Sequence, residues 1–349
     1  MNVLILTGRF GMGHIKAAEA IREAIQASDP QVHVNIVDFT EYLFPRLSDH
    51  IYKSFDFLVN RCRKLYNHCN RAADRYGQAP FQSMLLQKTD RLLASCKPDL
   101  VIATLPFCGQ YISRWKKARN SSLPLYTYIT DVTLHEEWIS SGTDLYFAAA
   151  EKTREALLSR GIPPGKIVVS GVPVRQRFYS AGAPHQGPLH VLIMGGGLGM
   201  ISCSKSLLDQ LHRDPLILTT IVTGKNTHLA RKLRDNYPDF HILGYTEEIH
   251  HYMKKADLLI TKPGGVTTFE SIASRTPLFL LPPELEQEKN NAQFVVEKGL
   301  GLVLTPDSCL PSGLIANRHL LNSMRRNMTK LADSLESTCP LPYFYEKNN

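Results

Sequence analysis

The stretch VLILTGRFGMGHIKAAEAI, residues 3–21 of this 349-residue chain, decides the fold that we expect. An apolar run leads into a glycine-rich loop, and an alanine-rich helical pattern follows the loop. Such a strand, loop and helix are typical of parallel α/β sheets, in which ligands bind at the carboxyl ends of the strands. The stretch therefore predicts an α/β fold with a ligand site at this loop.

The loop matches neither of the two common nucleotide-binding motifs. Gly8 and Gly13 have the outer spacing of a P-loop. His14 and Ile15, however, stand where that motif requires Lys and Ser or Thr. The dinucleotide fingerprint is broken as well, because Lys16 replaces its third glycine. These mismatches argue against a P-loop enzyme and against NAD(P) chemistry.

The composition is that of an ordinary globular protein, with 43% hydrophobic residues, 21% charged residues and a formal net charge of +8. The seven cysteines form no CxxC pair, which argues against a zinc site or a disulfide framework. The sequence contains no signature of a nucleic-acid-binding module and no apolar window long enough to span a membrane. With no signal or transit peptide recognised, we expect a bacterial cytoplasmic protein.

The opening pattern recurs in LHVLIMGGGLG, residues 189–199, after a Gly- and Pro-rich stretch at 180–188. We therefore expect two Rossmann-like domains facing a central cleft, residues 1–182 and 183–325, and a tail at 326–349 whose return to the first domain is left open. A basic helix is expected at 315–335. The other expected strands are 33–37, 100–104, 125–130, 145–149, 167–170, 216–223, 241–243, 257–261 and 278–281.

The segment after the strand at 257–261 is the strongest candidate for a nucleotide site. Pro263, Gly264 and Gly265 precede a helix, and the N–H groups of its first turn can hold a diphosphate without a metal. Thr267 and Thr268 add hydroxyl groups there. Glu270, one turn further, can accept hydrogen bonds from a ribose. The alternatives are an ordinary strand-to-helix turn and an acid that complements the helix dipole.

Polar side chains also follow the next strand, after Pro282 and Pro283. Such side chains at the carboxyl end of a strand can bind sugar hydroxyls, although some must be ordinary solvated positions. Gln287 is the first candidate, followed by Glu288 and Asn291.

Three blocks of the chain resemble one glycosyltransferase family. They are GRFGMGHIKAAEAI (8–21), TDVTLHEEWISSGTDLYFAAAEKTREALLSRGIPPGKIVVSGVPVRQRF (130–178) and KPGGVTTFE…ELEQEKNNAQFVVEKG (262–299). The family contains plant monogalactosyldiacylglycerol synthases and bacterial processive diacylglycerol glucosyltransferases. The chain is more distantly similar to the enzyme that adds N-acetylglucosamine to lipid I.

The resemblance implies a GT-B fold in which the first domain takes the acceptor and the second a UDP-sugar. It implies no cofactor besides this donor substrate. The usual Pro-Gly-Gln-Glu is replaced by residues 285–288, Leu-Glu-Gln-Glu, which leaves the donor sugar open. The donor-binding residues that it implies, together with those expected above, are Gly195, Gly196, Gly197, Gly199, Thr223, Gly224, Tyr245, Lys262, Pro263, Gly264, Gly265, Thr267, Glu270, Gln287, Glu288 and Asn291.

His14 is the expected catalytic base, because a neutral imidazole at a helix N-terminus can take a proton from an acceptor hydroxyl. The family places its essential histidine at this motif; the alternative is a histidine that caps a tight turn. Asp131 is expected to orient His14 or to bind the acceptor, and a helix cap is the alternative. The acceptor-side residues expected around them are Gly8, Phe10, Gly11, Gly13, His135 and Trp138.

Residues 48–77 contain an apolar helical stripe beside basic side chains. This helix is expected either to lie on an anionic membrane surface or to pack on its own domain. The stripe is formed by Ile51, Phe55, Leu58, Cys62, Leu65 and Cys69, and the basic residues are Lys53, Arg61, Arg63, Lys64 and Arg71.

The sequence has no D-x-D motif, which argues against the metal-carboxylate clamp of GT-A transferases. We therefore expect metal-independent chemistry, with inversion at C1 of the sugar. The expected reaction moves a hexose from a UDP-sugar to a lipid hydroxyl, with diacylglycerol as acceptor, on the inner face of the cell membrane. The alternatives are a polyprenyl-linked or small-molecule acceptor, a UDP-sugar 2-epimerase and a non-catalytic sensor. No nucleic-acid partner is expected, and the oligomeric state is open.

Overall fold

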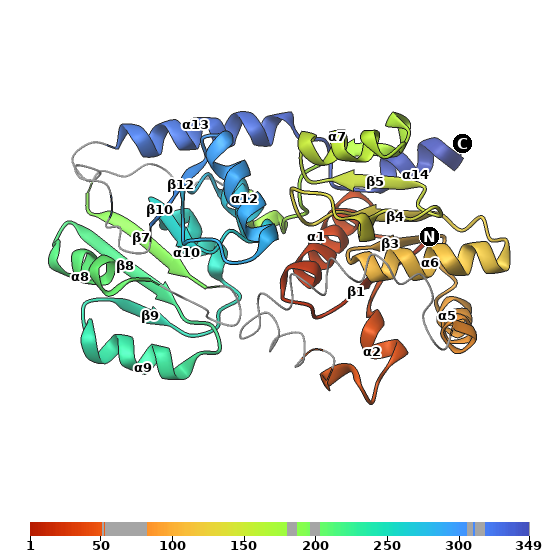
Figure 1. The fold of residues 1–349 in the computed structure, drawn as a ribbon, viewed down its shortest axis with the longest axis horizontal. Helices are drawn as coiled ribbons and strands as arrows, with labels where there is room; N and C mark the ends of the chain where they lie inside the picture. The colour runs from red at the N-terminus through yellow and green to blue at the C-terminus, as the bar shows by residue number, and fades with distance from the viewer. Residues whose placement is uncertain are drawn as a thin grey trace. The chain divides into compact units, whose positions relative to one another are not determined.

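The structure is a computed structural model that describes residues 1–50, 52, 82–179, 187–195, 203–305, 310 and 318–348. The chain divides into two compact units (Figure 1). Unit 1 consists of Met1–Gln176 and Leu335–Asn349, and unit 2 of Arg177–Ser334. The expected domain boundary after residue 182 lies outside the described residues. The expected start of the tail, residue 326, lies inside a helix of unit 2.

Unit 1 is a parallel six-stranded sheet in the order β2-β1-β3-β4-β5-β6. Its strands are β1 (Asn2–Thr7), β2 (His33–Asp38), β3 (Leu100–Ala103), β4 (Leu125–Tyr128), β5 (Leu145–Ala148) and β6 (Ile167–Val169). The helices among its described residues are α1 (Gly13–Ser28), α2 (Phe39–Leu43), α5 (Gln82–Cys96), α6 (Pro106–Arg119), α7 (Glu151–Ser159) and α14 (Leu341–Asn348). Three short 3₁₀ turns are η1 (Glu136–Trp138), η2 (Pro164–Lys166) and η3 (Gln176–Phe178), the last crossing into unit 2.

The faces of this sheet follow from strand periodicity, because successive side chains of a strand point to opposite faces. Val3 and Ile5 of β1 pack in one cluster with α1 and with Leu341 of α14. Leu4 and Leu6 pack in the other cluster, with α2, α5 and α6. Both faces are thus covered, which explains why the parallel strands are continuous apolar runs.

Unit 2 is a second parallel six-stranded sheet, in the order β12-β11-β10-β7-β8-β9. Its strands are β7 (Leu189–Met194), β8 (Ile217–Val222), β9 (His241–Leu243), β10 (Leu258–Thr261), β11 (Leu278–Leu280) and β12 (Gly301–Val303). Its described helices are α8 (Lys205–Arg213), α9 (Thr227–Asn236), α10 (Ile249–Lys255), α11 (Gly265–Ser274), α12 (Glu286–Glu297) and α13 (His319–Ser334).

A buried carboxylate ties the long helix α13 to the sheet of unit 2. Asp257, just before β10, pairs with Arg318 at 3.4 Å and with Arg325 at 3.1 Å. Its other oxygen accepts the backbone N–H of His190 at 3.0 Å. Leu321 and Met324 of α13 complete the core on this face.

Every strand expected from the sequence is present, with ends that differ by at most two residues. The edge strand β12 and the helix α14 were not expected, since both are short. The expected helix at 315–335 corresponds to α13, whose described part begins at His319. Within the described ranges, no helix has the length and hydropathy needed to cross a membrane.

Candidate active site

Each sheet has one point where the strand order reverses, and ligands of open α/β sheets bind beside that point at the carboxyl ends of the strands. In unit 1 the reversal lies between β1 and β3. In unit 2 it lies between β7 and β10. The glycine loop at 8–13 follows β1, and Lys262 to Gly265 follow β10. The topology therefore places both expected sites at the crevices of their own sheets.

The glycine loop of unit 1 is held in a defined conformation. A Cβ added to Gly8 would lie 3.1 Å from Leu105 Cδ2, so a larger residue would require the Leu105 side chain to shift by a few tenths of an ångström. Gly11 has φ +77°, which favours glycine. Arg9 pairs with Asp38 at 3.1 Å, and the Tyr52 hydroxyl donates to the same carboxylate at 2.5 Å. These contacts hold Gly8 and Arg9, at the start of the loop that leads to His14.

His14 is the second residue of α1, and its ring reaches across the reversal point to β3. Its Nδ1 lies 2.8 Å from the backbone oxygen of Thr104 and 3.1 Å from Oγ1 of Thr130. Because a carbonyl oxygen only accepts, Nδ1 must carry the proton. In the neutral imidazole the other nitrogen, Nε2, then has a free lone pair and can act as a base.

The protonation state of His14 suits this role. Burial lowers the pKa of His14 below 6.5, while the negative charge of Asp131 and the hydrogen bond to Thr104 partly offset this effect. Near neutral pH the imidazole is therefore uncharged.

The other acceptor-side residues differ in their surroundings. Asp131 follows β4, is half-buried and acts on His14 through its charge. Phe10 packs edge-on against Tyr52 at 5.0 Å. Trp138 is only 2% exposed, and its ring centroid is 6.4 Å from that of His14. Trp138 thus belongs to a buried hydrophobic cluster close to the ring of His14.

His135 and Trp138 lie in a segment that forms only the 3₁₀ turn η1, with His135 at its N-cap. The backbone N–H groups of Trp138 and Ile139 bond to the carbonyls three residues before them, which closes the tight turn. The half-buried His135 therefore lies before the turn and the buried Trp138 at its end.

The donor segment of unit 2 begins with an uncapped helix. Gly264 is the N-cap of α11 and makes no side-chain cap. By contrast, Ser204 caps α8 and Asn226 caps α9 with side-chain oxygens. The first N–H groups of α11 are therefore left for another acceptor, as in an anion site. Thr267 Oγ1 is 4.0 Å from the position that a Cβ on Gly264 would take, so this hydroxyl borders the same spot.

Polar side chains support the segment Lys262 to Gly265 from the neighbouring strand end. Lys262 pairs with Glu284 at 3.3 Å. Asn291 is 1% exposed and donates from Nδ2 to the carbonyl oxygen of Pro263 at 3.0 Å. Asn291, which was expected to contact the sugar, therefore bonds to the backbone of the segment Lys262 to Gly265.

Glu288, also expected to contact the sugar, caps its own helix through one carboxylate oxygen. Its Oε2 accepts the backbone N–H groups of Glu284 at 2.8 Å and Leu285 at 3.1 Å. Among the three expected sugar-binding side chains, the half-buried Gln287 is the one with no such local contact among the described residues.

The remaining donor candidates lie at the ends of β7, β8 and β9 and in α11. Thr223 is buried and donates to the backbone oxygen of Leu243 at 2.9 Å, which joins the ends of β8 and β9. Gly224 has φ +56°, and Tyr245 is 47% exposed. Glu270 is buried one turn into α11. Gly195 directly follows β7, whereas Gly196, Gly197 and Gly199 lie outside the described residues, as does the amphipathic stretch 53–77.

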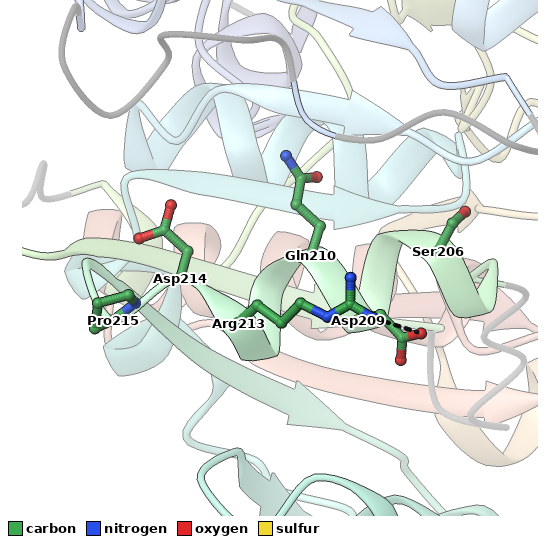
Figure 2. A pocket seen from close by; sticks show the side chains of 6 residues that line it. All are labelled: Ser206, Asp209, Gln210, Arg213, Asp214 and Pro215. Atoms are coloured by element: carbon green, nitrogen blue, oxygen red, sulfur yellow. Dashed lines mark ion pairs between the residues drawn. The ribbon is translucent and has the colours of Figure 1, made fainter.

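A separate hollow runs along α8 in unit 2 (Figure 2). Ser206, Asp209, Gln210 and Arg213 recur along one face of the helix, and Arg213 pairs with Asp209 at 3.9 Å. The hollow ends at residues 214 and 215, before the amino end of β8. Because ligands of such sheets bind at the opposite edge, we do not assign it to the active site.

Three residues of these sites were not predicted from the sequence: Thr104, Thr130 and Glu284. Thr104 and Glu284 follow β3 and β11, the strands that pair with β1 and β10, and Thr130 follows β4, the strand next to β3. The signal was present, because polar residues at strand carboxyl ends are candidates by position. To choose among these polar residues, the order of the strands in the sheet must be known, and the sequence alone did not supply that order.

Two family models match successive parts of the chain. The monogalactosyldiacylglycerol (MGDG) synthase family matches residues 14–174, and the C-terminal domain of glycosyltransferase family 28 matches residues 190–338. The chain is 28% identical to a processive diacylglycerol beta-glucosyltransferase of Bacillus licheniformis, covering 95% of this chain and 91% of the relative. The identity to the enzyme of the same name from Bacillus subtilis is also 28%, with the same coverage.

Solved structures resemble the fold over nearly the whole chain. MurG of Acinetobacter baumannii has a TM-score of 0.63 at 17% identity and covers 98% of both chains. The spinosyn rhamnosyltransferase SpnG has a TM-score of 0.61 at 15% identity, covering 99% of this chain and 100% of its own. These likenesses, with the two parallel six-stranded sheets, confirm the expected α/β GT-B fold.

Proposed function

This chain belongs to the glycosyltransferases that join an MGDG synthase domain to a family 28 C-terminal domain, and from this premise we propose that it transfers a hexose from a UDP-sugar to a hydroxyl of diacylglycerol. The names of the relatives at 28% identity support a diacylglycerol acceptor. Structural neighbours solved with UDP support a uridine nucleotide as the leaving group.

One observation carries the proposed mechanism: the hydrogen bond between His14 Nδ1 and the Thr104 carbonyl at 2.8 Å. It leaves Nε2 of a neutral imidazole as the proton acceptor. In the proposed reaction, Nε2 takes the proton of the acceptor hydroxyl as the oxygen attacks the anomeric carbon. Asp131 stabilises the imidazolium that forms, because its negative charge raises the pKa of His14.

The donor site is proposed at the start of α11. The uncapped N–H groups after Gly264 and the hydroxyl of Thr267 bind the diphosphate, whose charge increases as the bond to the sugar breaks. Glu270 is proposed to bind the ribose and the exposed Tyr245 to contact uracil. Gln287 is proposed to contact the sugar.

The proposed stereochemical outcome is inversion. One oxygen enters at the anomeric carbon as UDP leaves from the opposite side, so one bond forms and one breaks in a single displacement. The proton ends on His14, and the diphosphate takes the electron pair. This scheme needs one base and no enzyme nucleophile, in agreement with His14 as the proposed proton acceptor.

We further propose that the reaction takes place on an anionic membrane surface. The chain has a formal net charge of +8, which favours such a surface. Met12, in the loop before His14, is 39% exposed. An apolar side chain beside the proposed base suits an acceptor with acyl chains.

The test is UDP release from a panel of UDP-hexoses, with and without diacylglycerol in anionic vesicles. We expect release that depends on diacylglycerol, and NMR of the glycolipid is expected to show an inverted anomeric centre. Equal release without lipid would contradict the lipid acceptor. Isomerised UDP-sugar formed without acceptor would instead identify a 2-epimerase.

A further inference from the structure

Three side chains with metal-binding atoms lie together at the start of α10, outside the sites described above. They are Glu248, His250 and His251, and one ligand atom of each lies within 4.8 Å of the other two. Nε2 of His251 is 3.1 Å from Oε2 of Glu248, and Nε2 of His250 is 3.7 Å from the same oxygen. Two imidazoles therefore converge on one carboxylate oxygen.

These separations can be compared with those of a tetrahedral metal site. Zinc–nitrogen and zinc–oxygen bonds of about 2.0–2.2 Å place two ligand atoms roughly 3.3–3.5 Å apart. The two histidine–carboxylate distances lie on either side of this range, each within a few tenths of an ångström. The three ligand atoms lie within 4.8 Å of one another, so rotation of the side chains would have to bring them closer together around an ion.

The hydrogen bonding of His250 is an independent observation. This histidine is only 6% exposed, yet its Nδ1 has no hydrogen-bond partner among the described residues. Its Nε2 is too far from Glu248 for a hydrogen bond. Nδ1 is the buried unpaired atom, whereas Nε2 is the atom that faces the Glu248 carboxylate. A bound ion would give Nε2 a partner.

One basic side chain also approaches the cluster. Arg177 lies 3.8 Å from Oε1 of Glu248, the oxygen that does not face the histidines. Arg177 thus forms an ion pair with the oxygen of Glu248 that the ion would not bind, as the outer partners of metal ligands do.

We propose that Glu248, His250 and His251 bind one divalent transition-metal ion of the zinc class. Two imidazoles and one carboxylate are a ligand set that zinc uses, with water in the fourth position. The ion would join residue 248, in the loop after β9, to the first turn of α10. The site is independent of the proposed transfer reaction, because none of its ligands is assigned to the donor or acceptor.

The experiment uses the full chain and Co²⁺ as the probe, since Co²⁺ in a zinc site gives visible absorption bands. Titration of the wild type is expected to saturate at one Co²⁺ per chain, and one equivalent of Zn²⁺ is expected to remove the bands. The double variant His250→Ala/His251→Ala is expected to lose them. His228→Ala is the matched control, because His228 is also an exposed helical histidine of unit 2, and it is expected to bind as the wild type does.

Glu248→Gln keeps the test decisive if the double variant does not fold. It removes a charge from a partly exposed side chain, and Co²⁺ affinity is expected to fall at least about tenfold. Unchanged binding by either variant, or an equal loss in His228→Ala, would overturn the proposal. A sulfur-to-cobalt charge-transfer band that disappears after cysteine alkylation would also overturn it, because the ion would then be bound by thiolates.

Discussion

Units 1 and 2 use the same local structure, a strand that ends in a glycine loop before a helix, for two different chemical tasks. Met12 before α1 and Gly264 before α11 are both N-caps without a side-chain cap. In unit 1 the helix presents a half-buried imidazole whose proton is held by a carbonyl. In unit 2 it presents N–H groups and a threonine hydroxyl. The first arrangement suits proton removal and the second suits anion binding.

The difference shows how one electrostatic feature supports both tasks. The positive end of a helix dipole favours anions and disfavours cations. At α11 it would favour a diphosphate. At α1 it would act in the same direction as burial, which lowers the pKa of His14 and keeps the imidazole neutral. The residue at the helix start therefore decides whether the site binds charge or accepts a proton.

The largest expected effect is on kcat, and it distinguishes proton removal in unit 1 from UDP binding in unit 2. His14→Ala is expected to lower kcat by about 10²–10⁴-fold, the usual contribution of a general base. The affinity for UDP, measured by calorimetry, is expected to stay the same, because the proposed donor site belongs to unit 2. A variant that lost UDP binding in parallel with kcat would show that the division of tasks is wrong.

Thr267→Val tests the anion site of α11. If Thr267 donates to the diphosphate, removal of a hydrogen bond to a charged group costs about 1.5–3 kcal/mol, so UDP affinity should fall by roughly 10- to 100-fold. The matched control is Thr268→Val, since the neighbouring hydroxyl is buried and lacks a hydrogen-bond partner among the described residues. Calorimetry with UDP should detect a loss in the first variant alone. Equal losses would point to a general disturbance of the helix.

These two sites also show how far the sequence could be interpreted. The apolar runs predicted the strands because parallel strands are buried on both faces, and the glycine loops predicted where each sheet binds ligands. The partners of His14 could not be predicted in this way. Thr104 and Thr130 lie 90 and 116 residues away in the chain, and only the strand order brings them together.

The polar residues at 286–291 show a second kind of limit. The sequence placed them at a strand's carboxyl end but could not decide what each side chain contacts. Glu288 caps its own helix and Asn291 bonds to a neighbouring loop. Both contacts are to backbone atoms, which leave no trace in the residue pattern. The half-buried Gln287 stays a prediction for the sugar contact.

Asn291→Ala sharpens the comparison between loop support and ligand contact. Asn291 is buried and holds the Pro263 carbonyl at 3.0 Å. Its removal leaves that carbonyl without this donor, so the free energy of unfolding should fall by about 1–3 kcal/mol in denaturant titrations. Asn290→Ala, at a more exposed neighbour, is the control and should change stability by less than about 0.5 kcal/mol. Equal stability of the two variants would contradict the supporting role.

The smallest expected effect concerns the environment of the base in unit 1. The acid limb of kcat/KM against pH reports the pKa of the free base, which burial places below 6.5 in His14. Asp131 raises that pKa through its charge. Asp131→Asn removes the charge, so the pKa should fall further and the acid limb should move to lower pH.

The direction of this shift separates two roles of Asp131. A carboxylate that acts on the imidazolium must move the limb when its charge is removed, whereas a helix cap or an acceptor contact would lower the rate at every pH alike. Thr130→Val is the neutral comparison: it removes the hydroxyl 3.1 Å from Nδ1, leaves the Thr104 carbonyl in place and changes no charge. We therefore expect a smaller movement of the limb in Thr130→Val than in Asp131→Asn. A limb that stayed fixed, or moved to higher pH, in Asp131→Asn would rule out electrostatic coupling to the base.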